Sequence, residues 1–141
     1  MSVTETIHAT CVARGDHAVL LTGRSGAGKS DLALRLIDRG WLLVSDDYTC
    51  LVARDGALIA TPPATIAGQI EIRGIGIVAL PHLASARVAL VCDLDGDVAR
   101  MPDPDTRIVA GIALPCFALA GLEPSAPLKL ERLLPAGETP S

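Results

Sequence analysis

The chain has 141 residues, of which 50% are hydrophobic and 2% aromatic, with a formal net charge of −4. This length suits one ordinary domain, and the negative charge offers no basic surface for a nucleic-acid backbone, so we exclude nucleic acid as a partner. No apolar run approaches the ~20 residues that span a bilayer, and the N-terminus does not resemble a signal peptide. We therefore expect a soluble, cytoplasmic protein without membrane contact.

Strands dominate the predicted secondary structure. Apolar and alternating runs predict strands at residues 7–13, 17–23, 41–46, 48–54, 57–61, 70–74, 75–80, 86–94 and around 109–119. We expect residues 1–134 to form one catalytic domain and residues 135–141 to be a disordered tail.

One helix is well specified by the sequence. Between residues 29 and 39 the apolar side chains fall on one face, and Gly40 is a typical residue at the end of a helix. Asp31 and Arg35 are spaced to form an ion pair on the other face. A second, shorter helix is expected over residues 126–134.

The four cysteines are dispersed and show no C-x-x-C spacing. Each lies in an apolar, strand-like run, which favours reduced core residues over a disulfide framework or a zinc site. They are Cys11, Cys50, Cys92 and Cys116.

The segment GRSGAGKS fits the pattern Gly, any four residues, Gly, Lys, Ser or Thr. Between a buried strand and a helix, this pattern is typical of a loop that holds nucleotide phosphates. The predicted nucleotide-binding residues are Gly23, Arg24, Ser25, Gly26, Ala27, Gly28, Lys29 and Ser30. Backbone N–H groups of residues 25–30 would face the phosphates, Lys29 would bind their oxygens and Ser30 would ligate Mg²⁺. A flexible glycine loop without a ligand is the alternative.

Two adjacent carboxylates, Asp46 and Asp47, end the apolar run WLLVSDD. We expect this strand to lie parallel beside the strand that precedes the glycine-rich loop, which would bring one carboxylate to the phosphates in a Walker-B-like role. Because neighbouring residues of a strand point to opposite faces, the two carboxylates should differ in role. A solvated turn between two strands is the alternative.

The run IEIRGIGIVAL places an acid and a base, Glu71 and Arg73, two residues apart and so on one face of a strand. Taken alone, this spacing is commoner in a strand with an exposed ion pair than in an active site.

Together, the segments IHATCVARGDHAVLLTGRSGAGKSDLALRLIDRGWLLVSDD and EIRGIGIVAL resemble the catalytic domain of the bacterial HPr kinase/phosphorylase family. That family has a strand with a histidine, a G-x-S-G-x-G-K-S loop, a V-x-D-D strand end and an E-I-R-G-x-G-I signature, in this order. The resemblance implies an α/β P-loop fold related to phosphoenolpyruvate carboxykinase, rich in strands and with one central helix after the phosphate loop. It also implies transfer of phosphate from ATP, or from pyrophosphate, to a serine of the phosphocarrier protein HPr, reversible by phosphorolysis.

The resemblance further assigns roles to single residues. The catalytic residues would be His8, Lys29, Asp46, Arg73 and Arg100, and the metal ligands Ser30, Asp47 and Glu71. Asp46 would accept the proton of the substrate serine, and Arg100 is the most loosely aligned of the set. His8 without the family pattern would be interpreted as a structural strand histidine. The implied cofactors are ATP and Mg²⁺.

Two departures from the family pattern shape the expected function. The chain corresponds to a short form with the C-terminal catalytic domain only, and the segment RIVAGIALPCFALAGL lacks the R-P-G-R-N-like run linked to dephosphorylation. We therefore expect kinase activity more than phosphorylase activity. The alternatives are a small-molecule P-loop kinase and a nucleotide-sensing module without transfer. By resemblance, a homo-oligomer, for example a hexamer, is expected.

Overall fold

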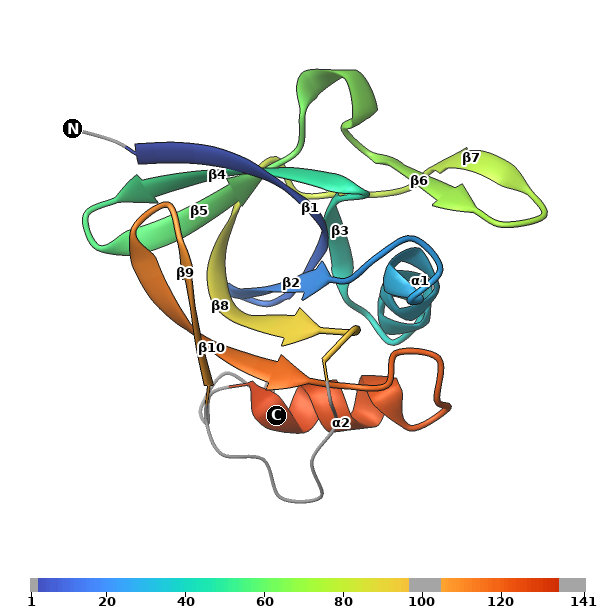
Figure 1. Cartoon of the computed structure of the whole chain (residues 1–141). Helices are drawn as coiled ribbons and strands as arrows, with labels where there is room; N and C mark the ends of the chain where they lie inside the picture. The colour runs from blue at the N-terminus through green and yellow to red at the C-terminus, as the bar shows by residue number, and fades with distance from the viewer. Residues whose placement is uncertain (1–2, 97–104, 135–141) are drawn as a thin grey trace.

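The computed structural model describes residues 3–96 and 105–134. Its strands are β1 (Val3–Arg14), β2 (His17–Thr22), β3 (Leu42–Ser45), β4 (Tyr48–Arg54), β5 (Ala57–Thr61), β6 (Gln69–Ile72), β7 (Gly76–Ala79), β8 (Ala86–Asp93), β9 (Asp105–Val109) and β10 (Ile112–Ala118). The helices are α1 (Lys29–Asp38), α2 (Ala126–Leu133) and a 3₁₀ turn, η1 (Ala64–Ile66). The fold is therefore mixed α/β and rich in strands, as predicted (Figure 1).

The main sheet is curved and closes on itself. Its strands pair in the order β2-β1-β4-β5-β8-β10-β9, and a further pairing joins β2 to β8. β2, β1, β4, β5 and β8 thus form a closed ring of paired strands, which is visible in Figure 1. Both neighbours of β2 are therefore fixed along its length, one antiparallel and one parallel.

The long strand β1 pairs with β2 along one edge and with both β3 and β4 along the other. The sequence-based expectation that β3 lies directly beside β2 is wrong, because β1 runs between them. β3 still points the same way as β2, since both are antiparallel to β1. The residues that follow the two strands therefore reach the same end of the sheet.

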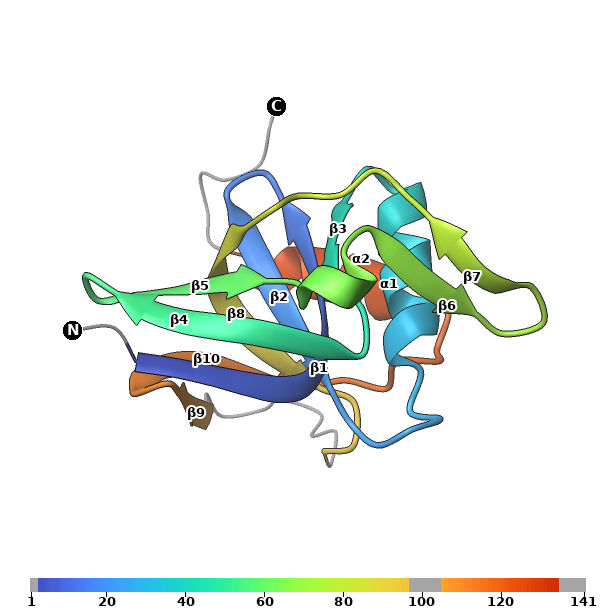
Figure 2. The same ribbon diagram turned by 90° about the horizontal axis from the view of Figure 1, so that it is seen from above.

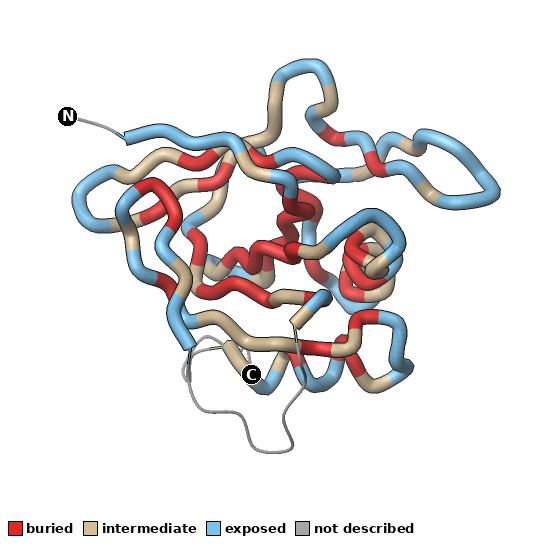
Figure 3. Tube along the Cα trace, in the orientation of Figure 1, coloured by how far each residue is buried: buried red, intermediate tan, exposed pale blue. Residues whose placement is uncertain are grey.

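Apolar side chains cover both faces of the sheet. In β2, successive side chains point alternately into two different cores. Val19 and Leu21 point into a core shared with the helices, whereas Ala18 and Leu20 point into a second core. The helix-facing core includes Leu32, Leu36, Trp41, Leu43 and Leu130. The second core is built from smaller strand residues such as Ala9, Cys11, Leu51, Ala60 and Val91. Figure 3 shows the buried trace along these strands and helix faces.

The two helices pack on the same side of the sheet and are joined by Glu131 of α2. Its carboxylate accepts hydrogen bonds from Arg39 at 2.6 Å and from the indole N–H of Trp41 at 3.0 Å. The hydrogen bond from Arg39 lowers the pKa of Glu131 from its usual value. Glu131 is thus held as a carboxylate that ties α2 to the end of α1.

Three predicted strand runs have a different form in the structure. The run around 109–119 becomes β10, which a turn at Ala110 and Gly111 joins to the preceding strand β9, and the two strands pair antiparallel. The runs 70–74 and 75–80 shorten to β6 and β7, which form a separate two-stranded sheet. Figures 1 and 2 both show this hairpin projecting beside α1.

All four cysteines are free, and the prediction that they are core residues holds fully for two of them. Cys11 and Cys92 are buried, and Cys50 and Cys116 are half-buried. Burial raises the pKa of the Cys11 thiol and raises that of Cys92 to about 12. These two thiols are therefore poor nucleophiles. Among the described residues, no helix has the length and apolar character needed to cross a bilayer.

Candidate functional site

A pocket of about 660 Å³ opens between the glycine-rich loop (residues 23–30), the first turn of α1, the end of β3 and the β6–β7 hairpin. Its lining brings together residues of the segments GRSGAGKS, WLLVSDD and IEIRGIGIVAL. The lining residues include Ser25, Gly26, Gly28, Lys29, Ser30, Asp46, Asp47, Glu71, Arg73 and Leu122.

The glycine-rich loop needs glycine at its last bend. Gly28, which caps the N-terminus of α1, has φ +98°, in the left-handed region. A Cβ atom there would also lie 2.7 Å from Cδ2 of Leu122. The loop is thus covered on one side by the turn that contains Leu122. This turn is fixed by Arg35 of α1, which donates hydrogen bonds to the carbonyl groups of Gly121 and Glu123.

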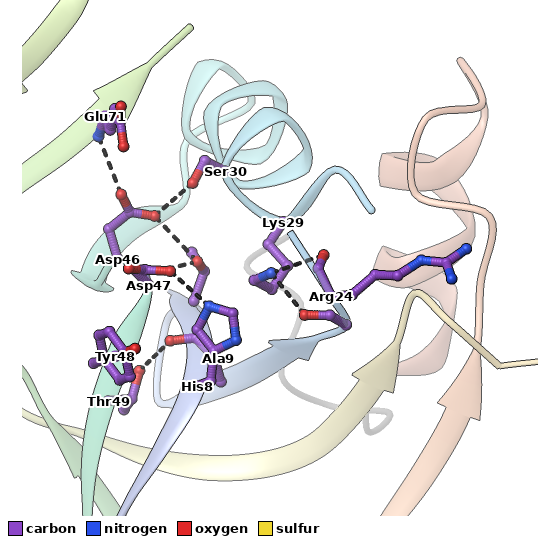
Figure 4. Close-up of polar contacts among 12 residues, drawn as sticks. His8, Ala9, Arg24, Lys29, Ser30, Asp46, Asp47, Tyr48, Thr49 and Glu71 are labelled. Carbon is purple, nitrogen blue, oxygen red and sulfur yellow. Dashed lines mark hydrogen bonds and ion pairs between the residues drawn. The ribbon is translucent and has the colours of Figure 1, made fainter. Parts of the chain in front are cut away.

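Lys29 is buried although its side chain carries a charge. Its side chain is only 7% exposed, and Nζ donates to the carbonyl oxygens of Gly23 at 2.7 Å and Arg24 at 3.1 Å (Figure 4). Two of the three ammonium donors therefore close the loop. Within the described residues the third donor has no protein acceptor, which suits a phosphate oxygen.

The loop also uses one of the amides expected to face phosphate. The N–H of Ala27 donates to the carbonyl of Arg24 at 3.0 Å, so this amide is engaged in a turn. The N–H of Arg24 donates to Asp95 Oδ2 at 2.6 Å, which anchors the start of the loop to the chain after β8. The loop is thus shaped by contacts from residues outside the motif.

Asp46 is a buried carboxylate, 6% exposed, on which three donors converge. Oδ1 accepts hydrogen bonds from the hydroxyl groups of Ser30 at 2.6 Å and Thr10 at 3.1 Å. Oδ2 accepts from the backbone N–H of Glu71 at 3.0 Å. Figure 4 shows Asp46 between Ser30 and Glu71, so that it joins the helix, the sheet and the hairpin.

Asp47 differs from Asp46 in its exposure and its hydrogen-bond partner. It is exposed, has a left-handed φ of +68°, and Oδ1 lies 2.7 Å from Nε2 of His8. The ring of Tyr48 lies 5.2 Å from that of His8. His8 is therefore positioned by a carboxylate and an aromatic ring, as Figure 4 shows, and reaches the pocket through Asp47 without lining it itself.

Glu71 and Arg73 do not lie together on one strand face. β6 ends at Ile72, so Arg73 is in the hairpin turn, where the N–H of Ile75 donates to Ile72 O at 3.0 Å. The ion pairs of the described residues do not join Glu71 to Arg73. Both residues line the pocket. Arg100 lies outside the described residues, as does the tail 135–141.

The donor set fits Mg²⁺ only together with phosphates. Among the described residues, no group of three His, Cys, Asp or Glu side chains could hold a metal ion alone. Mg²⁺ is commonly bound by one or two carboxylates, waters and substrate phosphates. The buried Asp46 carboxylate and the hydroxyl of Ser30, 2.6 Å apart beside the loop, supply such a partial set.

Sequence analysis missed three residues that shape the site: Thr10, Tyr48 and Asp95. Thr10 could have been found, because it follows His8 by two residues and so shares its strand face. Asp95 could not, since its partner Arg24 is 71 residues away in the sequence.

Comparison with known proteins agrees with the resemblance. The family model "HPr Serine kinase C-terminal domain" matches residues 1–88. A relative named HPr kinase/phosphorylase from Clostridium botulinum strain Eklund 17B is 42% identical over 77 residues, which are 55% of this chain and 25% of the relative. One from Geobacillus strain WCH70 is 38% identical over 103 residues, 67% of this chain and 33% of the relative. The chain thus spans a third or less of these relatives.

A solved structure agrees over most of the chain. The structure titled "Structure of the Hpr(Ser) kinase/phosphatase from Coxiella burnetii" has a TM-score of 0.80 and 31% sequence identity, and the match covers 92% of this chain and 93% of that one. The likeness extends beyond residue 88, where the family model ends. With the family model matching more than half of its residues, this chain belongs to the HPr serine kinase C-terminal domain family.

Proposed function

We propose that this chain is a protein serine kinase that transfers the terminal phosphoryl group of ATP to a serine of the phosphocarrier protein HPr. The observation that supports this most directly is the convergence of the glycine-rich loop, Asp46 and Asp47 on one pocket, with His8 bound to Asp47 from outside its lining. A phosphate-binding loop alone would suit many activities. The same loop facing two carboxylates and a histidine provides anion binding, a metal ligand and a proton acceptor in one place.

The glycine-rich loop would bind the phosphates of ATP. The N-terminus of α1 favours negative charge, and Lys29 has a donor available for a phosphate oxygen. Because phosphoryl transfer needs positioning and charge neutralisation more than covalent help, these groups are the main catalytic contribution of the loop.

Ser30 and Asp46 would hold Mg²⁺, with Glu71 at the rim of the pocket as a further ligand. When bound with ATP, Mg²⁺ supplies positive charge to the phosphate oxygens. The Ser30 hydroxyl can offer a lone pair to the metal while its hydrogen is donated to Asp46.

The contacts favour exchanging the roles that the resemblance gives to the two carboxylates. Asp46 is buried and already accepts three hydrogen bonds, so a substrate hydroxyl has little access to it. Asp47 is exposed and is oriented by His8. We therefore assign proton acceptance to Asp47. The serine oxygen bonds to the terminal phosphorus, the bond to the bridging oxygen breaks, ADP leaves, and the serine proton passes to Asp47.

The surroundings of the pocket suit a macromolecular substrate. Ile75 in the hairpin turn is 75% exposed and Ile77 on β7 is 72% exposed, and Ile75 lines the pocket. An apolar, projecting hairpin beside the site offers contact surface to a protein and little enclosure for a metabolite. This observation favours HPr over a small-molecule acceptor.

The test is to incubate the chain with ATP, Mg²⁺ and HPr of the same organism, and to map phosphoserine by mass spectrometry. We expect one modified serine in HPr and strongly reduced modification in a reaction with the Lys29→Met variant. ATP binding without phosphoserine would support a nucleotide-sensing module, and transfer to a metabolite alone would support a small-molecule kinase. Cytoplasmic location remains a prediction from the sequence, and a homo-oligomeric state, for example a hexamer, remains a prediction from the resemblance.

A further inference from the structure

Thr10 lies where the ladder between β1 and its partner strands is interrupted. β1 pairs Cys11 with Ser45 of β3 and His8 with Tyr48 of β4. Between these pairs, Asp46 and Asp47 lie outside both strands. Opposite a gap in a ladder, backbone groups need other partners.

The Thr10 side chain supplies those partners. It is fully buried, and its hydroxyl oxygen accepts a hydrogen bond from the backbone N–H of Asp47 at 3.1 Å. The same hydroxyl donates its hydrogen to Oδ1 of Asp46 at 3.1 Å. One hydroxyl group therefore contacts both members of the acidic pair, the carboxylate of the first and the backbone of the second.

Each contact fixes something the proposed chemistry requires. The bond to Asp46 orients the carboxylate oxygen that also accepts from Ser30. The bond to the Asp47 N–H stabilises a left-handed backbone, φ +68°, which is uncommon for residues other than glycine although aspartate tolerates it better than most. That backbone conformation directs the Asp47 side chain to His8.

We propose that Thr10 is a positioning residue that couples the Mg²⁺-binding carboxylate, Asp46, to the proton-accepting carboxylate, Asp47. This inference rests on the proposed function and extends it to a residue that the motifs do not include. Thr10 is fully buried and is not among the residues that line the pocket. It acts through the two aspartates.

The matched variants are Thr10→Val, Thr10→Ser and Thr49→Val. Valine has the shape of threonine without the hydroxyl, and serine restores the hydroxyl. Thr49 is the control, since it is equally buried and donates at 2.8 Å to the carbonyl of Ala9 without contacting either carboxylate (Figure 4). Both valine variants lose one buried hydroxyl, so both should lower thermal stability.

The first readout is the Mg²⁺ concentration that gives half-maximal binding of a fluorescent ATP analogue. We expect Thr10→Val to raise this concentration about tenfold, as loss of a hydrogen bond to a charged group implies. Thr10→Ser and Thr49→Val should stay within about threefold of the unsubstituted chain. The second readout is transfer to HPr at saturating Mg²⁺, where Thr10→Val should lower kcat about tenfold and leave the KM for HPr unchanged.

The Mg²⁺ titration does not involve HPr, so the two proposals can fail separately. If the chain binds ATP with Mg²⁺ and does not phosphorylate HPr, the proposed function is wrong, and the titration still decides the role of Thr10. Equal Mg²⁺ requirements in Thr10→Val and Thr49→Val would overturn the positioning role. So would an effect of Thr10→Ser as large as that of Thr10→Val, or the absence of any Mg²⁺-dependent ATP binding.

Discussion

The hydroxyl group of Ser30 donates a 2.6 Å hydrogen bond to Oδ1 of Asp46, which joins the first turn of α1 to the residue after β3. Asp46 Oδ2 accepts from the N–H of Glu71 in β6. The carboxylate thus lies at the meeting point of three elements. Because Asp47 has different partners, substitutions of Asp46 and of Asp47 test the roles of the two carboxylates separately.

The first prediction concerns Asp46→Asn. The amide keeps the size of the side chain, removes its charge and places an N–H₂ group where an acceptor is needed for Ser30, Thr10 or Glu71. We expect the Mg²⁺ requirement for ATP binding to rise at least about tenfold, the order expected for lost hydrogen bonds to a charged group, with transfer partly restored at high Mg²⁺. Mg²⁺ titrations of ATP binding and of transfer to HPr measure both effects.

The second prediction concerns Asp47→Asn, which replaces the exposed carboxylate beside His8 with an amide that cannot take up a proton. We expect transfer to HPr to fall by about 10² to 10⁴, the usual contribution of a general base, with ATP binding nearly unchanged. Steady-state kinetics and equilibrium binding of ATP separate the two effects. If instead Asp46→Asn gives the loss that Mg²⁺ cannot restore, Asp46 is the proton acceptor, as the family resemblance implies.

The third prediction concerns Lys29→Met. Removal of the ammonium group should lower transfer by about 10² to 10³, as loss of one stabilising donor commonly does. Because Lys29 also binds the carbonyls of Gly23 and Arg24, the loop itself should become less ordered. Circular dichroism should show the sheet intact. Lys129→Met, at an exposed position on α2, is the matched control and should keep full activity; near-normal turnover of Lys29→Met would contradict the phosphate-loop assignment.

The fourth prediction concerns pH and Glu131. Its pKa is lowered in the folded chain, so its contribution to stability is present above the unfolded value of about 4.3 and is lost as pH falls through the folded value. Glu131→Gln should therefore lower the melting temperature at pH 7, and the difference should shrink below about pH 4.

Thermal melts from pH 3 to pH 7 measure this difference. The control is Glu123→Gln, whose carboxylate is exposed and 3.5 Å from Lys129, and which should have little effect. A constant difference between Glu131→Gln and the unsubstituted chain at every pH would mean that packing, and not charge, explains the loss.

The last prediction concerns the reverse reaction. Phosphorolysis requires a second anion site for inorganic phosphate, and the basic residues that line the pocket among those described are Lys29 and Arg73. We expect phosphate-driven release of pyrophosphate from phosphoserine-HPr to be slow or absent under conditions that give rapid forward transfer. The measurement is pyrophosphate release at millimolar phosphate, and a rate comparable to the forward one would show that other residues hold the second anion.

The local parts of this fold were predictable because their signals are local. The helix after the loop begins at Lys29 as expected and ends at Asp38, since its apolar period and the glycine after it act within a few residues. Most strand runs are also where the alternation of side chains placed them, with ends shifted by a few residues, whereas β9 before the run around 109–119 was not predicted as a separate strand. These features depend on neighbours in sequence and on little else.

The arrangement of the strands was not predictable in the same way. The position of β1 between β2 and β3 depends on pairings between distant segments, and a hydrophobic run does not encode its neighbour. The burial of Lys29 likewise depends on carbonyl groups that turn toward it only in the folded loop. The roles of Asp46 and Asp47 were expected to differ, and their opposite exposure follows from the gap between β3 and β4, which no local pattern marks.

The parallel pairing of β2 with β8 has a consequence for the order in which the molecule can form. β2 leads directly into the glycine-rich loop, yet its partner β8 ends at Asp93, so some seventy further residues must leave the ribosome before the pair can close. At ~5–20 residues per second this takes several seconds, during which one edge of β2 is open. The glycine-rich loop is therefore synthesised early but is held in its folded position only late. A nascent chain should bind nucleotide only after β8 has emerged from the ribosome.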